Sequence, residues 1–248
     1  MVTIPESHPR YKSLQKREKI VAGIEAGITS KQGLIAHGRG EAFDYLIGER
    51  TLPAAMRATE AAAALLLIAK KPVISVNGNV AALVPEKLIA LSALIPAPLE
   101  VNIFYWTEAR VRRIAEHLER LGANNVLGRE AEACIPGIAH ARARADTAGI
   151  YAADVVFTPL EDGDRCEALI TMGKRVISVD LNPFSRTSRY ATVSIVDDVD
   201  RALDNLIALI HAAKLSPVTM SDFNNQRNLK AVIDEIIERL RVEESGGW

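Results

Sequence analysis

The chain has 248 residues, of which 48% are hydrophobic and 25% charged, a composition that suits a soluble globular protein with a sizeable core. A formal net charge of −1 and an aromatic content of 5% argue against a nucleic-acid-binding protein. The apolar run 61–69 is too short to span a bilayer. Cys134 and Cys166 form no C-x-x-C pair and no zinc spacing, which suits two free thiols, so we expect a cytoplasmic protein that binds no membrane.

Residues 1–70 are predicted to form a helical N-terminal part. A helix capped by Ser7 ends at Gly27 and carries a basic face, which is more often solvated than ligand-binding. A turn is expected in the segment 37–44, which reads HGRGEAFD. Its two glycines allow Arg39 to approach an anion closely, but they equally suit a plain turn between helices.

An Ala-rich helix over residues 53–69 ends this N-terminal part. Thr51 is expected to cap it, and a proline occupies its first turn. Its small side chains suit close helix packing, either within one chain or between two subunits.

From residue 71 to residue 241, apolar runs typical of buried strands alternate with helical segments. This alternation predicts an α/β fold, namely a Rossmann-like, doubly wound and mainly parallel sheet joined to the helical N-terminal part. Asp197 is expected to cap the helix after the last strand, an amphipathic helix is predicted at 221–241, and the tail 242–248 is expected to be flexible. The strands are predicted at 73–76, 99–104, 125–127, 154–158, 176–179 and 192–196.

The first of these strands is followed by Asn77, Gly78 and Asn79 and then by a helix. Such a turn can bind an anion through backbone N–H groups and the helix dipole. No Walker lysine and no G-x-G-x-x-G motif accompanies it, so it matches neither a P-loop nor a dinucleotide fingerprint. The alternative is an ordinary strand-to-helix turn.

Three carboxylates, those of Glu161, Asp162 and Asp164, follow the strand 154–158. Carboxylates at the carboxyl end of a strand can hold Mg²⁺, directly or through water. The helix dipole also favours acidic residues at a helix N-terminus, and this is the more frequent reason for them. The preceding segment 135–149 is compatible with a helix or with a functional loop.

The polar loop that follows the strand 176–179 is the main candidate for a ligand site, because ligands of open α/β sheets bind beyond the carboxyl ends of the strands. Asp180 can accept hydrogen bonds from a ribose or an exocyclic amine. Asn182 can donate and accept, and Arg186 offers several donors to a phosphate. The alternative is a solvated loop in which Asn182 and the proline after it only form a turn.

Five motifs occur in order over nearly the whole chain: HPRYKSL followed by Arg17-Glu18, AHGRGEAFDYLIGE, SVNGNVAAL, PLEDGDR and DLNPFSRTSR. Together they resemble the archaeal-type phosphopantothenate synthetase family, also called 4-phosphopantoate–β-alanine ligase. The resemblance runs from about Pro5 to Leu240. One departure is Phe184, where the family favours leucine, an apolar exchange that leaves the polar positions intact.

This resemblance implies a homodimeric enzyme of coenzyme A biosynthesis that condenses 4-phosphopantoate with β-alanine, uses ATP and Mg²⁺, and releases AMP and diphosphate. It assigns no catalytic residue with the same assurance. Because the nucleotide then has its own site, the turn Asn77-Gly78-Asn79 is expected to bind the phosphate of phosphopantoate. The ATP-binding residues implied by the resemblance are Arg17, Arg39, Asp180, Leu181, Asn182, Arg186, Thr187, Asp198 and Val199.

Two arginines of the N-terminal part, Arg17 and Arg39, are expected to reach the ATP phosphates although they lie far in sequence from the loop after the strand 176–179. The reason is charge, since Arg186 alone does not balance the triphosphate. The helical N-terminal part would then close over the sheet and exclude water. Lys16, by contrast, is expected to be a solvated charge of little consequence.

Two other functions are compatible with the residues. One is a different ATP-dependent carboxylate ligase or kinase, which releases ADP, and the other is a non-catalytic ATP-sensing dimer. The missing glycine fingerprint disfavours a dehydrogenase. The arginines suit the stabilisation of phosphoryl charge, and no persuasive Cys/His or Ser/His arrangement suggests a nucleophilic side chain.

Overall fold

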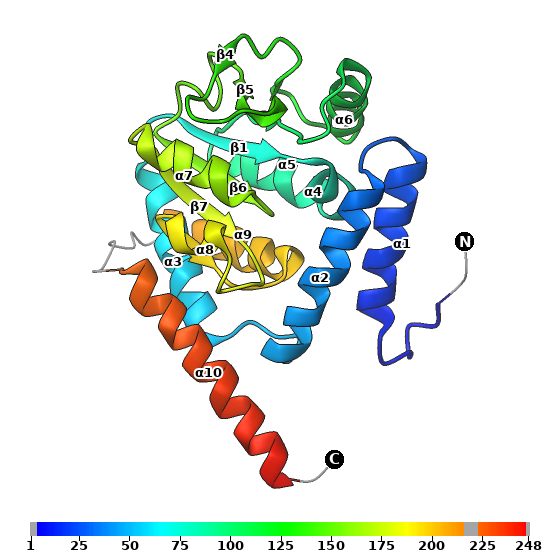
Figure 1. Ribbon diagram of the computed structural model, residues 1–248, viewed down its shortest axis with the longest axis vertical. Helices are drawn as coiled ribbons and strands as arrows, with labels where there is room; N and C mark the ends of the chain where they lie inside the picture. Colours follow the sequence, from blue (N-terminus) through cyan, green and yellow to red (C-terminus); the bar gives the residue numbers. More distant parts are fainter. Residues whose placement is uncertain (1–3, 216–222, 247–248) are drawn as a thin grey trace.

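The computed structural model describes residues 4–215 and 223–246. Within them, six parallel strands form one sheet in the order β3-β2-β1-β6-β7-β8, and helices cover both of its faces (Figure 1). The predicted α/β fold with a doubly wound parallel sheet is therefore confirmed. The sheet strands are β1 Pro72–Val76, β2 Leu99–Val101, β3 Val126–Leu127, β6 Val155–Pro159, β7 Arg175–Val179 and β8 Val193–Ile195. The helices are α1 Tyr11–Glu25, α2 Lys31–Ile47, α3 Pro53–Ile68, α4 Gly78–Leu83, α5 Pro85–Leu94, α6 Glu108–Arg120, α7 Gly163–Thr171, α8 Arg186–Tyr190, α9 Val199–Leu215 and α10 Asn225–Gly246.

The order of the strands defines where a ligand is expected. The chain builds β1, β2 and β3 outward in one direction, and then returns to the other side of β1 to build β6, β7 and β8. The direction reverses between β1 and β6, and ligands of doubly wound sheets bind in the crevice at such a switch point, beyond the carboxyl ends of the strands.

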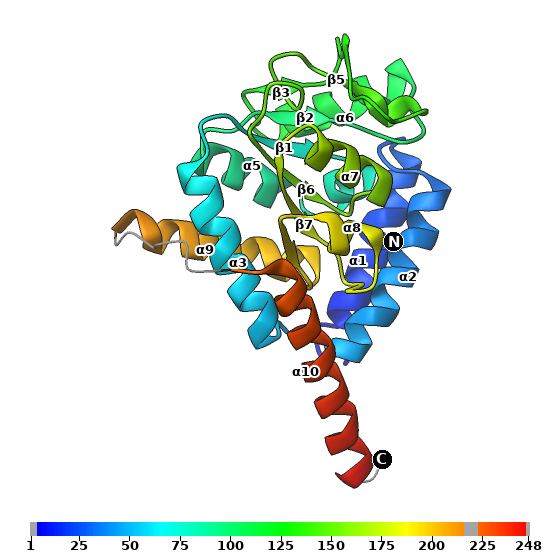
Figure 2. The ribbon, with the colours of Figure 1, turned by 60° about the vertical axis from the view of Figure 1, so that its left-hand side comes forward.

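Both faces of the sheet are buried, because successive side chains of a strand point to opposite sides. In β7, Ile177 and Val179 belong to the core that includes α3, α5 and α9, whereas Val176 belongs to the core that includes α7. Figure 2 shows α3 and α9 on one side of β7 and α7 on the other. This explains why the strands read as continuous apolar runs rather than as alternating ones.

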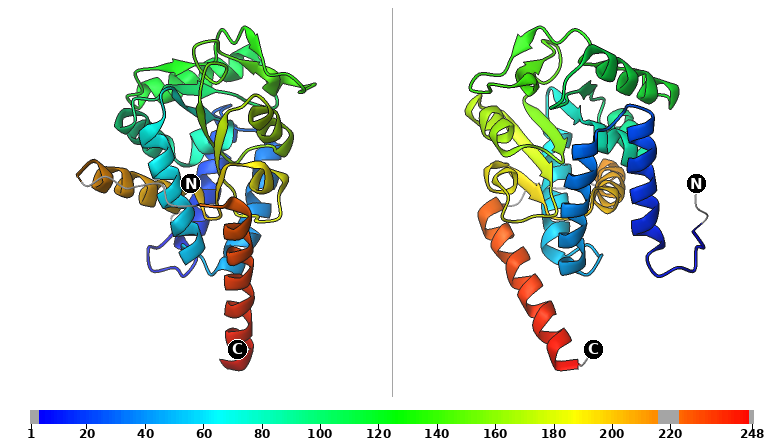
Figure 3. Two further views of the ribbon diagram at one scale, coloured as in Figure 1. Left: turned by 90° about the vertical axis from the view of Figure 1, so that its left-hand side faces the viewer. Right: turned by 45° about the vertical axis from the view of Figure 1, so that its right-hand side comes forward.

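The helices α1 and α2 form an antiparallel pair at the carboxyl edge of the sheet (Figures 1 and 3). α2 starts after Ser30, whose Oγ accepts a hydrogen bond from the N–H of Gly33 at 3.3 Å, and it ends before Gly48, which has a left-handed φ of 77°. The turn predicted at 37–44 is therefore wrong. Two glycines inside a helix cost about 1 kcal/mol each, which is too little to interrupt a helix with signals at both ends and packing along its length.

The capping of α3 also differs from the prediction. Thr51 does not cap it, but donates a hydrogen bond to Asp197 Oδ2 at 2.6 Å. The N-terminus of α3 is capped from α10 instead, because the carboxylate of Glu235 accepts hydrogen bonds from the N–H of Ala54 at 3.1 and 3.2 Å. The alanines of α3 are buried within the protomer, so their small size serves packing inside one chain.

Several boundaries differ from the sequence-based ones. The short helix α8 was not predicted, and the segment 135–149 contains part of a small hairpin of β4 Ala133–Cys134 and β5 Arg144–Ala145, with a 3₁₀ turn, Ala141–Ala143, rather than a helix. α10 continues to Gly246, into the predicted tail, and its predicted start at 221 lies outside the described residues. No helix in the ranges that the structure describes is long and apolar enough to cross a membrane.

Candidate functional site

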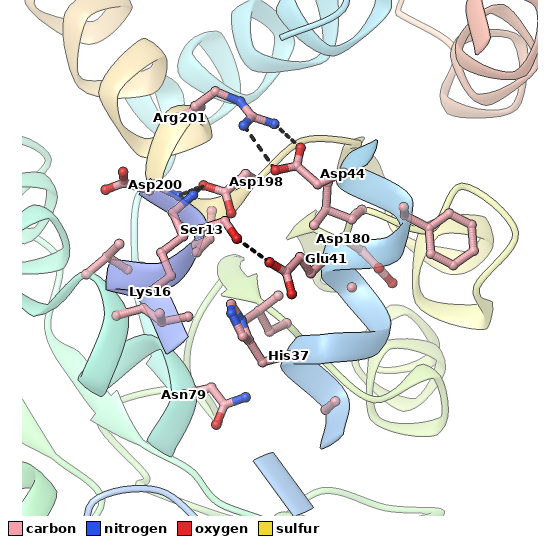
Figure 4. A pocket seen from close by; sticks show the side chains of 18 of the residues that line it. Ser13, Lys16, His37, Glu41, Asp44, Asn79, Asp180, Asp198, Asp200 and Arg201 are labelled. Atoms are coloured by element: carbon pink, nitrogen blue, oxygen red, sulfur yellow. Dashed lines mark hydrogen bonds and ion pairs between the residues drawn. The ribbon is translucent and has the colours of Figure 1, made fainter. Parts of the chain in front are cut away.

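A cavity of about 560 Å³ lies at the carboxyl edge of the sheet (Figure 4). The α1–α2 pair forms one wall, and the segments that follow β1, β6, β7 and β8 form the other. The cavity thus includes the switch point between β1 and β6, and its volume is that of an ordinary small-molecule site. This cavity is the candidate active site.

The loop after β7 contributes a preformed polar wall. Asp180 accepts a hydrogen bond from the N–H of Asn182 at 2.9 Å and another from the hydroxyl of Ser185 at 2.5 Å. Burial raises the pKa of Asp180, against the effect of these two hydrogen bonds and of the positive charge of Arg39. The side chain of Asp180 therefore both shapes the loop and faces the cavity with a carboxyl group that is protonated more readily than an exposed one.

The start of α9 contributes a second polar wall. Asp198, rather than the predicted Asp197, precedes the first helical residue and accepts a hydrogen bond from the N–H of Asp200 at 3.1 Å. The other partner of its Oδ1 is Lys16 Nζ of α1 at 2.6 Å, so this ion pair joins the N-terminal helices to the sheet.

α2 presents three ionisable side chains to the cavity along one face. His37, Glu41 and Asp44 have the i, i+4, i+7 spacing of a single helical stripe (Figure 4). Glu41 accepts hydrogen bonds from Ser13 at 2.5 Å and from Arg17 at 2.7 Å. Although burial works to raise the pKa of Glu41, the hydrogen bonds from Arg17 and Ser13 lower it, so this side chain is an anion.

The third member of the stripe, Asp44, pairs with Arg201 of α9, with its Oδ1 2.5 Å from Arg201 Nη2. Arg201 also pairs with Asp197, 2.7 Å away. These contacts give a second connection between α2 and α9. His37 and Arg39 differ, because within the described residues neither side chain makes a hydrogen bond or an ion pair, although both line the cavity.

The structure brings six of the nine expected ATP-binding residues to this cavity: Arg39, Asp180, Leu181, Asn182, Asp198 and Val199. The other three do not line it. Arg17 binds Glu41, Arg186 binds Glu167 at 2.8 Å, and the hydroxyl of Thr187 donates to the backbone carbonyl of Glu161 at 2.8 Å. Lys16, which was expected to be a solvated charge of little consequence, lines the cavity, whereas Arg17 does not.

The turn at residues 77–79 has a clear structural function. Asn77 caps α4, because its Oδ1 accepts from the N–H groups of Asn79 and Val80 at 3.0 and 3.2 Å. Gly78 is buried against the backbone of the loop between α1 and α2, and a Cβ there would lie 2.6 Å from the carbonyl oxygen of Ile28. The side chains of Asn77 and Asn79 line the cavity, whereas Gly78 does not.

The carboxylates that follow β6, which were the metal candidates, are engaged by other protein groups. Glu161 is fully buried between Arg142, 2.9 Å away, and Arg165. Asp162 pairs with Arg142 at 2.5 Å, and Asp164 lies 2.7 Å from His140 Nε2. Each carboxylate is thus occupied by a cation or an imidazole, and no group of three or more His, Cys, Asp or Glu side chains able to hold a metal occurs in the part of the chain that the structure describes.

Comparison with known proteins shows which family this chain belongs to. Residues 54–239 match the family described as phosphopantothenate/pantothenate synthetase. The chain belongs to this family. A curated 4-phosphopantoate–β-alanine ligase of Thermococcus kodakarensis is 52% identical over all of this chain and 98% of the relative. Two relatives with the same description are also similar. The one from Methanosarcina mazei is 51% identical over 98% of this chain and 97% of the relative. The one from Methanospirillum hungatei is 53% identical over 82% of this chain and 83% of the relative.

The family match confirms the resemblance that the motifs indicated. It starts within α3 and so leaves α1 and α2 aside, but the alignment with the Thermococcus relative covers these two helices as well. Among the cavity residues of these helices and of α9 that sequence reasoning missed are Lys16, His37, Glu41, Asp44 and Arg201. The stripe on α2 was detectable from its spacing, but the segment was interpreted as a turn, and a turn gives no reason to look for helical spacing.

Proposed function

We propose that this member of the phosphopantothenate synthetase family is an ATP-dependent ligase of coenzyme A biosynthesis, which joins 4-phosphopantoate to β-alanine and releases AMP and diphosphate. The observation that carries the proposal is the 52% identity, over the whole chain, with a curated 4-phosphopantoate–β-alanine ligase. The position of the cavity at the switch point of the sheet supports it.

The chemistry of such a reaction suits the side chains in the cavity. A carboxylate is a poor electrophile, and transfer of AMP to it gives a mixed anhydride that an amine can attack. The developing charge on phosphorus and on the departing diphosphate needs cations more than it needs a nucleophilic side chain. Lys12, Lys16, Lys19, Arg39 and Arg201 line the cavity and can supply them.

For ATP, we propose binding by the six expected residues that line the cavity. Arg39 is the proposed phosphate ligand, because its guanidinium makes no hydrogen bond or ion pair with the described residues and is available to an anion. Three expected ligands, Arg17, Arg186 and Thr187, are each bonded to another protein group. We propose that they bind ATP only in a form of the enzyme in which these bonds are broken.

Mg²⁺ is proposed to enter with the phosphates of ATP. The described residues offer no all-protein metal cage, but Mg²⁺ in nucleotide sites is commonly held by the phosphates with one or two carboxylates and water. Several cavity-lining carboxylates have the oxygen donors that Mg²⁺ prefers. When bound, the ion neutralises charge on the phosphates.

For the phosphate of phosphopantoate, we propose the turn Asn77-Gly78-Asn79 with Asn79 as the side-chain donor, because Asn77 Nδ2 already donates to the carbonyls of Pro159 and Leu160. Asn79 Nδ2 has a second N–H besides the one that it donates to Gly33. The side chains of Asn77 and Asn79 line the cavity near the switch point. Gly78→Val is not a suitable test, because the new side chain would collide with the carbonyl of Ile28. Asn79→Ala is a better one, and it is expected to raise the Michaelis constant for phosphopantoate more than that for β-alanine.

A cytoplasmic homodimer is also proposed, on the family resemblance alone. The Ala-rich helix α3 gives it no support, since its alanines are buried within the protomer. Sedimentation at micromolar concentration tests the dimer, and a stable, active monomer would contradict it.

The product of the nucleotide tests the proposed reaction. The protein is incubated with ATP, Mg²⁺, 4-phosphopantoate and β-alanine, and the nucleotide formed is identified chromatographically. We expect AMP and diphosphate only when both organic substrates are present. ADP would indicate the alternative ligase or kinase, and binding of ATP without any turnover would indicate the ATP sensor.

A further inference from the structure

His37 is the ionisable side chain of the α2 stripe to which none of the described residues bonds. It lies one helical turn before Glu41 and faces the cavity (Figure 4). Two carboxylates beside it are engaged, since Glu41 binds Ser13 and Arg17, and Asp198 binds Lys16. The imidazole makes no hydrogen bond with any residue in the described ranges, and its nitrogens are therefore available to a ligand.

The charges around His37 are of both signs and come from three elements. Glu41 lies on its own helix, Lys16 and Arg17 lie on α1, and Asp198 lies at the start of α9. Burial lowers the pKa of His37, and the positive charges of Lys16 and Arg17 add to this effect, while Glu41 and Asp198 oppose it. The ring is consequently neutral near pH 7, with a lone pair able to accept a proton.

The second half of the proposed reaction needs such a group. β-Alanine enters as an ammonium ion, which has no lone pair and cannot attack an acyl group. The cavity carries charges of both signs near His37, and these can attract both the ammonium group and the carboxylate of β-alanine. A base at this position would receive the substrate in its protonated form.

We propose that His37 is the general base that deprotonates β-alanine, an inference that rests on the ligase function proposed above. One proton passes from the ammonium nitrogen to the imidazole. The nitrogen lone pair then forms the C–N bond to the acyl carbon of the mixed anhydride, the bond from this carbon to the oxygen of AMP breaks, and AMP leaves with the electron pair. The second proton lost by the nitrogen goes to water, and His37 returns its own proton to water after the product leaves.

The test compares two amines in the wild type and in His37→Asn. Hydroxylamine is largely neutral near pH 7 and needs no base, so phosphopantoate-dependent AMP release with hydroxylamine should be nearly the same in both proteins. With β-alanine at the same pH, kcat of the variant is expected to fall about a hundredfold, without a comparable change in the Michaelis constant for ATP. The loss should shrink by about tenfold for each pH unit above neutrality, as more free amine becomes available without a catalyst.

The matched control is His117→Asn on α6. Burial also lowers the pKa of His117, but this side chain does not line the cavity, and its replacement should leave both rates unchanged. An equal loss with both amines, or an unchanged rate with β-alanine, in His37→Asn would overturn the role of His37. A wild type that releases no AMP with either amine would instead overturn the proposed function, so the two failures are distinguishable.

Discussion

Two sets of charged side chains meet at the carboxyl edge of the sheet, and they differ in their access to water. The buried cluster consists of Arg142, Glu161 and Arg165, whose side chains are at most 4% exposed. The cavity network consists of three ion pairs: Lys16–Asp198, Arg17–Glu41 and Asp44–Arg201. Their side chains are 10 to 40% exposed.

This difference decides what each set can do. Separating an ion pair in the protein interior leaves an uncompensated charge and costs several kcal/mol, whereas partly exposed pairs contribute about 1 kcal/mol or less. The cavity network can therefore exchange its partners for the charges of a substrate, while the buried cluster cannot. Acidic residues that look alike in the sequence thus belong to a buried cluster after β6 and to partly exposed ion pairs at the cavity on α2 and at the start of α9.

The largest effect is expected on the stability of the buried cluster. Glu161→Gln leaves Arg165 buried without its anion and Arg142 with Asp162 as its remaining partner, and we expect the free energy of unfolding to fall by about 3–5 kcal/mol. Urea denaturation measures it. The control is Glu167→Gln, which removes the exposed partner of Arg186 and should cost about 0.5 kcal/mol or less. Equal effects of the two changes would contradict the distinction between buried and exposed pairs.

A pH dependence of stability is expected from Glu100, which is fully buried in β2 and accepts hydrogen bonds from the N–H groups of Asp146 and Ile150. Burial raises its pKa to about 7. Since the folded state holds the proton more tightly than the unfolded one, this contribution is complete below the unfolded pKa of about 4.5 and is lost as the pH rises through about 7.

Between these two pH limits, the contribution of Glu100 to the free energy of unfolding decreases by about 3 kcal/mol. Unfolding is measured at several pH values in the wild type and in Glu100→Gln, which cannot ionise. The difference between the two proteins should change over this window and be constant above it. A difference independent of pH would show that Glu100 does not titrate in the folded protein.

The next effect concerns the affinity of the cavity for ATP. Arg39→Ala removes a guanidinium that the described residues leave without a partner, so stability should not change, while the dissociation constant for ATP should rise about 10- to 100-fold. Titration calorimetry measures the dissociation constant for ATP in the wild type and in the variant. Arg186→Ala is the matched variant, because Arg186 pairs with Glu167 away from the cavity. The reverse pattern, a weakened Arg186 variant and an unaffected Arg39 variant, would show that the phosphates bind on the other side of the loop after β7.

The smallest effect separates two neighbours on α1. Lys16 lines the cavity and Arg17 does not, so Lys16→Ala is expected to weaken ATP binding at least as much as Arg17→Ala. Each change should cost about 1 kcal/mol or less in stability. A strong effect of Arg17→Ala with no effect of Lys16→Ala would restore the expectation drawn from the sequence.

The sheet could be predicted well from the sequence, because each strand is marked by the few residues that form it. A run such as that of β7, buried on both faces, is apolar throughout, and the polar residues after it mark the carboxyl end. The glycines at 38 and 40 misled the prediction of α2, since a local cost of about 1 kcal/mol each is outweighed by capping and packing that no short window contains.

The partners of the charged side chains were not predictable for a related reason. Lys16 and Arg17 are adjacent in sequence but point about 100° apart around α1, and only the packing of α1 decides which one faces the cavity. Likewise, the pairing of Arg186 with Glu167 depends on how α8 packs beside α7. The resemblance to the family identified the right loops, but not the side chains that face the cavity from within them.

Hydrogen–deuterium exchange with and without ATP and Mg²⁺ tests most directly whether the cavity, and not the buried cluster, is the site of the reaction. Segments 37–44 of α2 and 180–185 after β7 line the cavity, and their amides should gain protection when ATP binds. The amides of 140–145, which carry Arg142 of the buried cluster, should exchange as before. Protection confined to 140–145, with none in the two cavity segments, would contradict the account.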